Sequence, residues 1–339
     1  LRRQRQMCIR DSDNIKLEKG LYTTGKSFTA ALEELDPTEN YKGTALEGLD
    51  AYERQLKRFD IKVSGSNSDP VSKFFATTDS AALFPEYVAR AVRTGIESNA
   101  VVDDVVATVT EIDSMDYRSI KTDFTKDDIS LDEVQEGAQI PELTIKLSDK
   151  LTKLKKHGKM LVASYEAIKF QKLDLFTTVL RQIGNHISRQ ELLQAISTVD
   201  EGDGVKHTRM NSADLNYEQL IKLWTDLAPY NMNTLVVGVN EFAKILSMPE
   251  FRDANAGLNF HSTGNVITPF GAKIILVNEL KDAILSFDKN FAFEKVQAGG
   301  VITEFDKLID RQLERATVST ITGFSVIYDD AVHVLEFNQ

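Results

Sequence analysis

The chain has 339 residues, of which 42% are hydrophobic and 27% charged, and this length is enough for one large hydrophobic core or two ordinary ones. It holds no apolar run near the roughly 20 residues that cross a bilayer and no secretory signal peptide, so we expect a cytoplasmic protein without membrane contact. Its formal net charge of −11 at pH 7 gives a surface that repels phosphate, which argues against specific nucleic-acid binding.

Residues 1–12 differ from the rest of the sequence. They begin without Met, carry four arginines and hold the only cysteine, Cys8. Because they resemble translated sequencing-adapter read-through, we interpret them as a non-native artefact and leave them out of the fold prediction. Without them the chain is more acidic and has no cysteine, so we expect neither a disulfide nor a thiolate metal site.

Residues 13–71 are predicted to form an N-terminal arm and linker. Helical spacing of apolar residues occurs in 28–35 and in 46–59, with Pro37 as a breaker between them. The stretch 64–70, Ser-Gly-Ser-Asn-Ser-Asp-Pro, reads as a linker. A helix is then expected to begin near Pro85, followed by a β-rich segment over 101–109.

Residues 117–159 carry charges of opposite sign in two arms, separated by turn residues that include Gly137 and Pro141. The second arm alternates apolar and polar residues at 143–147, as a half-buried strand does. We predict an extended β-hairpin, which needs a partner because an isolated hairpin is marginal in water. A solvated charged face is the alternative. The candidate inter-subunit contacts are Asp127, Asp128, Asp132, Glu133, Glu136, Lys146, Lys150, Lys153, Lys155, Lys156 and Lys159.

A long helix is predicted from about Asp174, as N-cap, to Val199, with a length of about 38 Å. Residues 213–284 have an α/β pattern. It contains a helix capped by Asn216 and an apolar strand at 274–277 that we expect to be buried on both faces. Several short strands are expected from residue 284 onward.

No defensible active site, cofactor site or metal site is found, so we expect a protein that is not an enzyme. Gly20 to Ser27 matches GxxxxGK[ST], the phosphate-binding loop, but the residues before it are too charged for the buried strand that this loop requires. The five histidines lack ligand spacing, and residues 200–204 lack the oxygen pattern of a calcium loop.

An ordered set of segments resembles the Hong Kong 97-type major capsid proteins of tailed bacteriophages. The segments are Thr77–Pro85, Glu136-Gly137, Lys155–Lys159, Val162–Ile168 followed by the long helix, Asn233–Val237, Pro269–Ala272 and Gly323–Val326. The resemblance covers about residues 72–339.

The resemblance implies an α+β fold with a peripheral domain that holds a long spine helix and a long β-sheet, an axial α/β domain, an extended β-hairpin loop and an N-terminal arm. We assign 72–116, 160–204 and 285–316 to the peripheral domain, 117–159 to the extended loop, and 205–284 and 317–339 to the axial domain.

The resemblance also implies that the protein assembles with itself as pentamers and hexamers into an icosahedral virion capsid around double-stranded DNA, in the cytoplasm of a bacterial host. Scaffolding protein, portal and maturation protease are further partners that it suggests. An encapsulin-like shell of a bacterial nanocompartment is the alternative, and a nucleotide-binding protein built on Gly25-Lys26-Ser27 is a third reading.

Overall fold

The computed structural model describes residues 15–17, 21, 27–98, 101–114, 116–122, 133–137, 145–164, 170–200, 204–211, 215–252, 266–308 and 313–338. The predicted artefact at residues 1–12 lies outside this part of the chain. The described residues divide into two compact units. Unit 1 takes its residues from 1–99, 157–187 and 301–320, and unit 2 from 100–156, 188–300 and 321–339.

Unit 1 contains the N-terminal helices and part of a β-sheet. Its helical elements are α2 (Phe28–Leu35), η2 (Thr38–Tyr41), α3 (Ala51–Arg58), η3 (Val71–Phe75), α4 (Thr78–Ala81), α5 (Phe84–Ser98) and the first half of α7 (Leu173–Asp200). Its strands are β10 (Ile302–Leu308), most of β4 (Lys155–Ser164) and the first part of β11 (Leu313–Val326). Both β4 and β10 pair with β11.

The segment predicted as an arm belongs to the packed interior of unit 1. Leu32 and Tyr52 are buried in the same hydrophobic cluster as Phe74. Between α2 and α3, the buried Arg54 donates through Nε to Asp36 at 2.8 Å, and its guanidinium lies over an aromatic ring. Residues 28–58 are therefore folded against the rest of unit 1, and the predicted domain boundaries stay a prediction.

Helices α5 and α7 touch backbone to backbone. A Cβ added to Gly95 would lie 2.2 Å from the carbonyl oxygen of Arg181, and one added to Gly184 would lie 2.2 Å from that of Val92. Only glycine leaves room for so close an approach.

The long helix is confirmed, and at 28 residues α7 is about 42 Å long. The prediction of Asp174 as its N-cap is wrong, because Asp174 lies inside the first turn. A carboxylate there still interacts favourably with the positive end of the helix dipole.

Unit 2 contains a five-stranded sheet with the strand order β5, β12, β8, β6, β7. The five strands are β5 (Lys206–Asn211), β6 (Thr234–Val237), β7 (Lys273–Leu276), β8 (Ala283–Phe287) and β12 (Val332–Asn338). The other elements of unit 2 are β1 (Val106–Ile112), β2 (Ile120–Thr122), β3 (Ile145–Leu147), α8 (Tyr217–Asp226), α9 (Val239–Ser247), α10 (Pro249–Arg252), β9 (Phe293–Ala298) and η7 (Asp329–Ala331). Asn216 caps α8 as predicted, accepting a hydrogen bond from the Gln219 amide.

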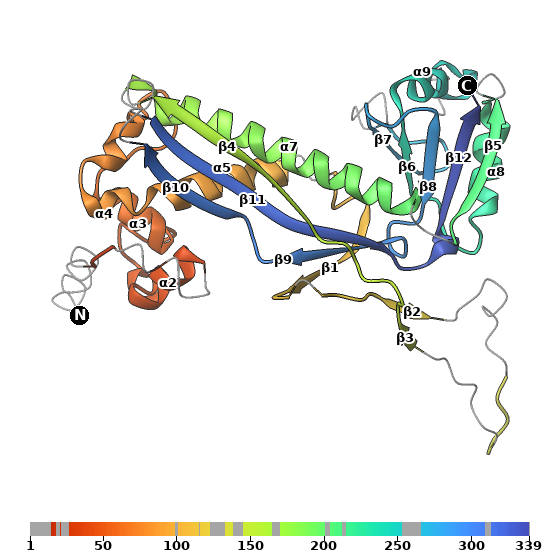
Figure 1. Cartoon of the computed structure of the whole chain (residues 1–339), viewed down its shortest axis with the longest axis horizontal. Coiled ribbons are helices and arrows are strands. Elements are labelled where there is room, and N and C mark those ends of the chain that lie inside the picture. The colour runs from red at the N-terminus through yellow and green to blue at the C-terminus, as the bar shows by residue number, and fades with distance from the viewer. Residues whose placement is uncertain are drawn as a thin grey trace. The chain divides into compact units, whose positions relative to one another are not determined.

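Apolar residues of the five-stranded sheet point alternately to its two faces. Leu235 and Val237 of β6 belong to one hydrophobic cluster together with residues of α8 and α9, whereas Val236 between them belongs to a second cluster that includes residues of α7. Figure 1 shows α8 and α9 beside this sheet. Ile274 and Ile275 of β7 follow the same rule and are buried on opposite faces. Leu276 is 45% exposed because β7 is the edge strand, so the predicted burial on both faces is confirmed for only part of the run 274–277.

Candidate functional site

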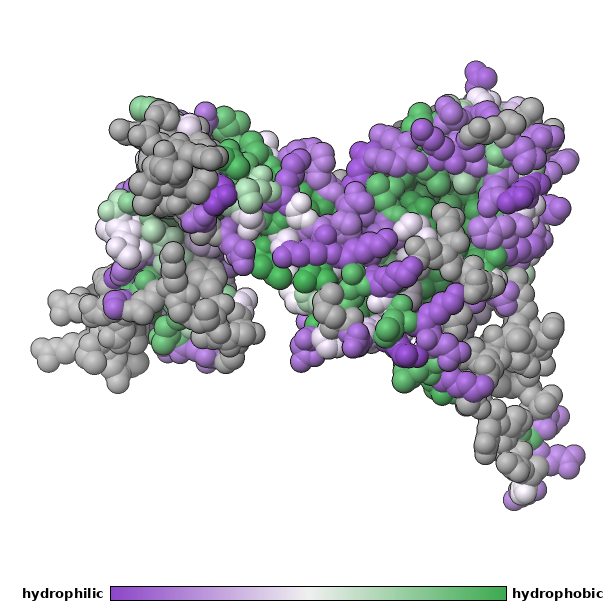
Figure 2. Space-filling model, in the orientation of Figure 1, coloured by the Kyte–Doolittle hydropathy of each residue, from purple (hydrophilic) through white to green (hydrophobic). Residues whose placement is uncertain are grey.

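The predicted hairpin begins as a two-stranded antiparallel ribbon, β2 with β3. Ile120 lies opposite Leu147, and Ile145 precedes Leu147 by two residues on β3, so these three side chains share one face. They are 53%, 66% and 65% exposed. Figure 2 shows apolar surface in this region, bordered by hydrophilic side chains. The ribbon therefore presents an apolar face that the described part of unit 2 leaves open.

Strand β9 pairs with β1 and β11 in a second sheet. The root of the ribbon is fastened to these strands by one buried carboxylate, Glu294 of β9, which is 6% exposed. Its Oε1 accepts hydrogen bonds from the hydroxyls of Thr110 and Tyr117, both at 2.6 Å. Its Oε2 accepts from the hydroxyls of Ser119 and of Ser325, the latter at 3.2 Å. We call these five residues the Glu294 hub. It joins the three strands β1, β9 and β11 to the segment that precedes β2.

The hub keeps its carboxylate ionised. Burial by itself raises the pKa of Glu294, but the hydrogen bonds from Ser119, Thr110, Tyr117 and Ser325 together lower it below the usual 4.5. The same interaction acts on Tyr117, whose pKa is raised first by burial and then by its hydrogen bond to Glu294.

Residues 148–155, which follow β3 and which we call the return segment, run past the ribbon root. The Ser148 amide donates to the Ser119 carbonyl at 2.8 Å, and the Thr152 amide donates to the Tyr117 carbonyl at 2.9 Å. A Cβ added to Gly323 of β11 would lie 2.9 Å from the Lys153 carbonyl oxygen, so glycine is needed for this close approach.

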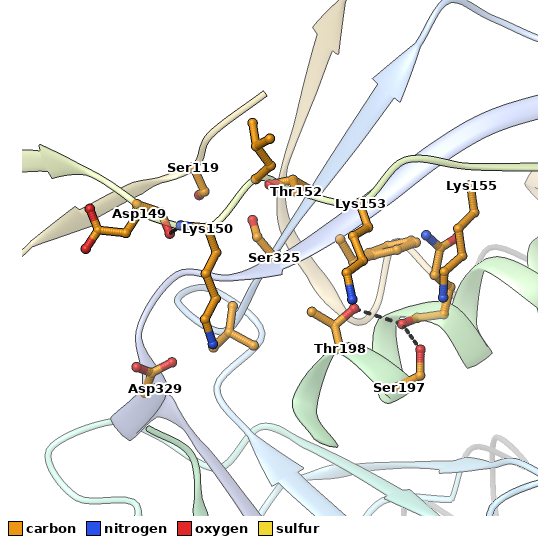
Figure 3. A pocket seen from close by; sticks show the side chains of 15 residues that line it. Ser119, Asp149, Lys150, Thr152, Lys153, Lys155, Ser197, Thr198, Ser325 and Asp329 are labelled. Carbon is orange, nitrogen blue, oxygen red and sulfur yellow. Dashed lines mark hydrogen bonds between the residues drawn. The ribbon is translucent and has the colours of Figure 1, made fainter. Parts of the chain in front are cut away.

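A pocket of about 650 Å³ lies between the return segment, α7 and the end of β11. Figure 3 shows the side chains of Lys153 and Lys155 extending toward Ser197 and Thr198 of α7, while Lys150 extends toward Asp329. The remaining lining residues are Ser119, Ser148, Asp149, Leu151, Thr152, Gln194, Phe324, Ser325 and Val326. We call this cavity the lysine pocket, because three ammonium groups and several hydroxyls line it.

The structure brings together some of the predicted contact residues and separates others. Lys150, Lys153 and Lys155 line the lysine pocket. Lys146 lies on β3, and Lys156 and Lys159 are exposed on β4, outside the pocket lining. Glu133 and Glu136 are exposed. Asp127, Asp128 and Asp132 lie outside the described residues. A role of any of them in inter-subunit contact stays a prediction.

Sequence reasoning missed the Glu294 hub and the part of the pocket that α7 supplies. Glu294 follows Phe293 in a predicted strand, and nothing in the order of residues shows that hydroxyls about 175 to 184 positions away will surround it. Ser197 and Thr198 are two common polar residues near the end of a helix. Neither the hub residues nor these two pocket residues have a sequence spacing that indicates a site.

Within the described ranges no group of three His, Cys, Asp or Glu side chains could hold a metal ion. The same part of the chain has no helix long and apolar enough to cross a membrane. The phosphate-loop match lies outside the described residues except for Leu21 and Ser27, and the Ser27 hydroxyl caps α2 by accepting from the Ala30 amide at 3.2 Å.

Comparisons with solved structures find the same fold in capsid subunits. A virus-like particle from Pyrococcus furiosus matches with a TM-score of 0.52 at 15% identity, over 74% of this chain and 98% of the other. The capsid of a native GTA particle, solved with C5 symmetry, matches with a TM-score of 0.52 at 15% identity, over 71% of this chain and 91% of the other. At these identities the likeness concerns the fold. It confirms the predicted α+β fold of the Hong Kong 97 type, while the individual subdomains stay predictions.

A search of curated proteins found no match to the sequence. A family model described as phage capsid protein matches residues 148–329, which is more than half of the chain. The matched region begins at the return segment and includes α7, the hub residues Glu294 and Ser325, and every strand of the five-stranded sheet except β12. The chain therefore belongs to the phage capsid protein family, and it is a structural protein of the capsid, not an enzyme.

Proposed function

We propose that this chain is the repeating shell subunit that assembles as pentamers and hexamers into an icosahedral capsid around double-stranded DNA. The observation that carries the proposal is the open apolar face of the β2–β3 ribbon. A two-stranded ribbon with three exposed aliphatic side chains is marginally stable by itself. A neighbouring copy that covers this face would remove the apolar surface from water and fix the ribbon.

The charges of the chain fit reversible assembly. An exposed ion pair contributes only about 0–1 kcal/mol, so single contacts between copies are weak and a misplaced copy can leave. Repeated around closed symmetry, many weak contacts still give a stable shell. A wall formed by subunits with a net charge of −11 would also avoid gripping packaged DNA.

The wider partners follow from the same proposal. We place the assembled protein in the virion and its assembly in the cytoplasm of a bacterial host, with a scaffolding protein, a portal and a maturation protease as further partners. We also propose that residues 28–58 remain in the mature subunit, because Leu32 and Tyr52 are buried in the hydrophobic cluster of unit 1.

The test is to express residues 13–339 and to follow assembly by size exclusion and electron microscopy. We expect capsomers or shells whose yield depends on salt concentration. A variant with Ile120, Ile145 and Leu147 replaced by Thr should give folded subunits that assemble poorly, whereas Val109→Thr, at a 49% exposed site on β1, serves as the matched control. A chain that stays monomeric at high concentration under every salt condition would overturn the proposal.

The contents of native particles distinguish a capsid from a shell that encloses other cargo. Particles purified from the native host are treated with nuclease, and their contents are analysed for DNA and protein. Packaged double-stranded DNA supports the capsid proposal, and a protein cargo without DNA supports the compartment alternative.

A further inference from the structure

We propose that His333 and Asp226 form a proton-operated clasp, which fastens the C-terminal end of α8 to the central strand β12 when the surroundings become mildly acidic. In the structure Asp226, the last residue of α8, pairs with Lys206 of β5 at 3.0 Å. When the His333 imidazole takes up a proton, the carboxylate moves from the lysine to the imidazolium. This clasp lies within one copy of the chain, so it does not depend on assembly.

His333 is buried where β5 and β8 flank β12 beneath the last turn of α8. Its neighbours in the sheet are Lys206 on one side and Ser286 on the other, and Figure 1 shows α8 beside β5 and β12. The His333 side chain is 3% exposed, and its Nδ1 lies 3.9 Å from Oδ2 of Asp226. A shift of about 1 Å therefore brings these two atoms to the distance of a charge-assisted hydrogen bond.

The other ring nitrogen of His333 is satisfied in both protonation states. Nε2 lies 2.9 Å from the hydroxyl oxygen of Thr208. A threonine hydroxyl donates to a neutral ring nitrogen and accepts from a protonated one, so it only has to rotate when the imidazole becomes charged. The buried ring can therefore take up a proton without losing its hydrogen bond to Thr208.

The charges around the clasp act on His333 in opposite directions. The titratable and hydrogen-bonding groups there are Asp226 and Lys222 of α8, Lys206 and Thr208 of β5, and Ser286 of β8, whose hydroxyl donates to the His333 carbonyl at 3.0 Å. Burial raises the pKa of Asp226, but the hydrogen bond and charge of Lys206, followed by the charges of His333 and Lys222, lower it overall. Because this coupling is mutual, the carboxylate favours the imidazolium, as does the negative end of the α8 dipole.

Lys206 is the partner that can give up the carboxylate. Its side chain is 51% exposed, so its ammonium group stays hydrated when Asp226 moves away. A buried imidazolium has no such access to water, so its charge requires the carboxylate more than the lysine does. The imidazole is also the side chain whose charge changes between about pH 5 and 8, so a mild fall in pH is enough to exchange the partners of Asp226.

The chain carries its own reporter of this exchange. Its only tryptophan, Trp224, lies on α8 two residues before Asp226 and is 44% exposed. Residues 13–339 are kept at a concentration too low for assembly, and Trp224 fluorescence is followed from about pH 8 to 5. We expect the emission to shift with one midpoint in this range. The shift should be absent in His333→Gln and in Asp226→Asn, whereas Lys206→Met should move the midpoint to higher pH by removing the competing cation.

His207→Gln is the matched control. His207 is bonded at 2.9 Å to Glu336, which follows His333 by three residues on β12 and so lies on the opposite face of the sheet. This variant should keep the shift, because His207 titrates away from α8. No shift in the unmodified chain, or a shift retained in His333→Gln, would overturn the proposal. If His333→Gln does not fold, Asp226→Asn, at a 27% exposed site, decides in the same way.

Far-ultraviolet circular dichroism, recorded over the same pH range, separates the clasp from unfolding. The helical signal should stay constant, because the exchange moves one side chain and leaves the backbone of α8 folded. A loss of helical signal that accompanies the fluorescence shift would assign the shift to unfolding and overturn the proposal.

Discussion

Replacing Glu294 by Gln should loosen the ribbon root without unfolding unit 2. The carboxylate accepts four hydrogen bonds from hydroxyls, and a hydrogen bond to a charged group contributes about 1.5–3 kcal/mol. Gln has the same shape and keeps one carbonyl acceptor, so about half of these bonds can persist in weaker, uncharged form. We expect the free energy of unfolding to fall by about 2–4 kcal/mol, less than the plain sum because bonds that share one acceptor are not additive.

The pH dependence of the hub follows from the lowered pKa of Glu294. The unfolded chain binds a proton at this carboxyl near the usual 4.5, whereas the folded chain does so only at lower pH. The stabilisation by the hub is therefore fully present above about pH 4.5, and it is lost as the pH falls through the pKa of the folded state. Glu294→Gln should remove this part of the acid sensitivity, since Gln does not titrate.

Hydrogen exchange measures the local effect. The Ser148 and Thr152 amides report on the root, because both donate to carbonyls of the segment before β2, at 2.8 and 2.9 Å. They should exchange faster in Glu294→Gln, while the amide of the buried Val236 in the five-stranded sheet keeps its protection. The control is Glu111→Gln on the exposed side of β1. Unchanged exchange at Ser148 and Thr152, or an equal increase at Val236, would refute the role of the hub as a local fastening.

Three further substitutions test contacts elsewhere. Gly184→Ala should cost about 1–3 kcal/mol in thermal or urea unfolding, although Ala is the better helix former, because its Cβ would meet the Val92 carbonyl; a gain in stability would contradict the close packing of α5 and α7. Arg54→Ala should cost about 3–5 kcal/mol, because it leaves the buried Asp36 carboxylate without its cation, and Lys57→Ala on the same helix is the exposed control. Lys295→Met should lower the free energy of unfolding by a similar amount, because it leaves the buried Glu191 carboxylate, 2.8 Å away, without its cation. Adding Glu191→Leu should recover most of that stability. If it does not, the ion pair is not the cause of the loss.

Local sequence patterns predicted the elements whose side chains repeat regularly. The helical spacing from 174 to 199, the cap at Asn216 and the continuous apolar run at 274–277 all specify structure through neighbouring residues. The hairpin could be predicted for the same reason, and the antiparallel pairing of β2 with β3 confirms the part of it nearest the ribbon root.

What the sequence could not show depends on contacts between distant residues. The predicted arm was assigned from a Gly, Ser and Pro stretch, but Tyr52 on its near side packs with Phe74 on its far side. Composition identifies a break in regular structure and does not reveal whether the flanking segments meet again in space. The basic arm shows the same limit, because its charge predicts contact with an acidic surface but not that Lys153 and Lys155 face α7 within the same chain.

The Glu294 hub and the lysine pocket share two side chains. The Ser119 and Ser325 hydroxyls both donate to Glu294 and both line the pocket. A carboxylate that takes up these two donors holds this wall of the pocket in one arrangement. The residues that fix where the extended loop leaves its own subunit therefore also shape the lysine pocket. This accounts for a buried, hydrogen-bonded glutamate in β9, where an apolar residue would fill the same space at less desolvation cost.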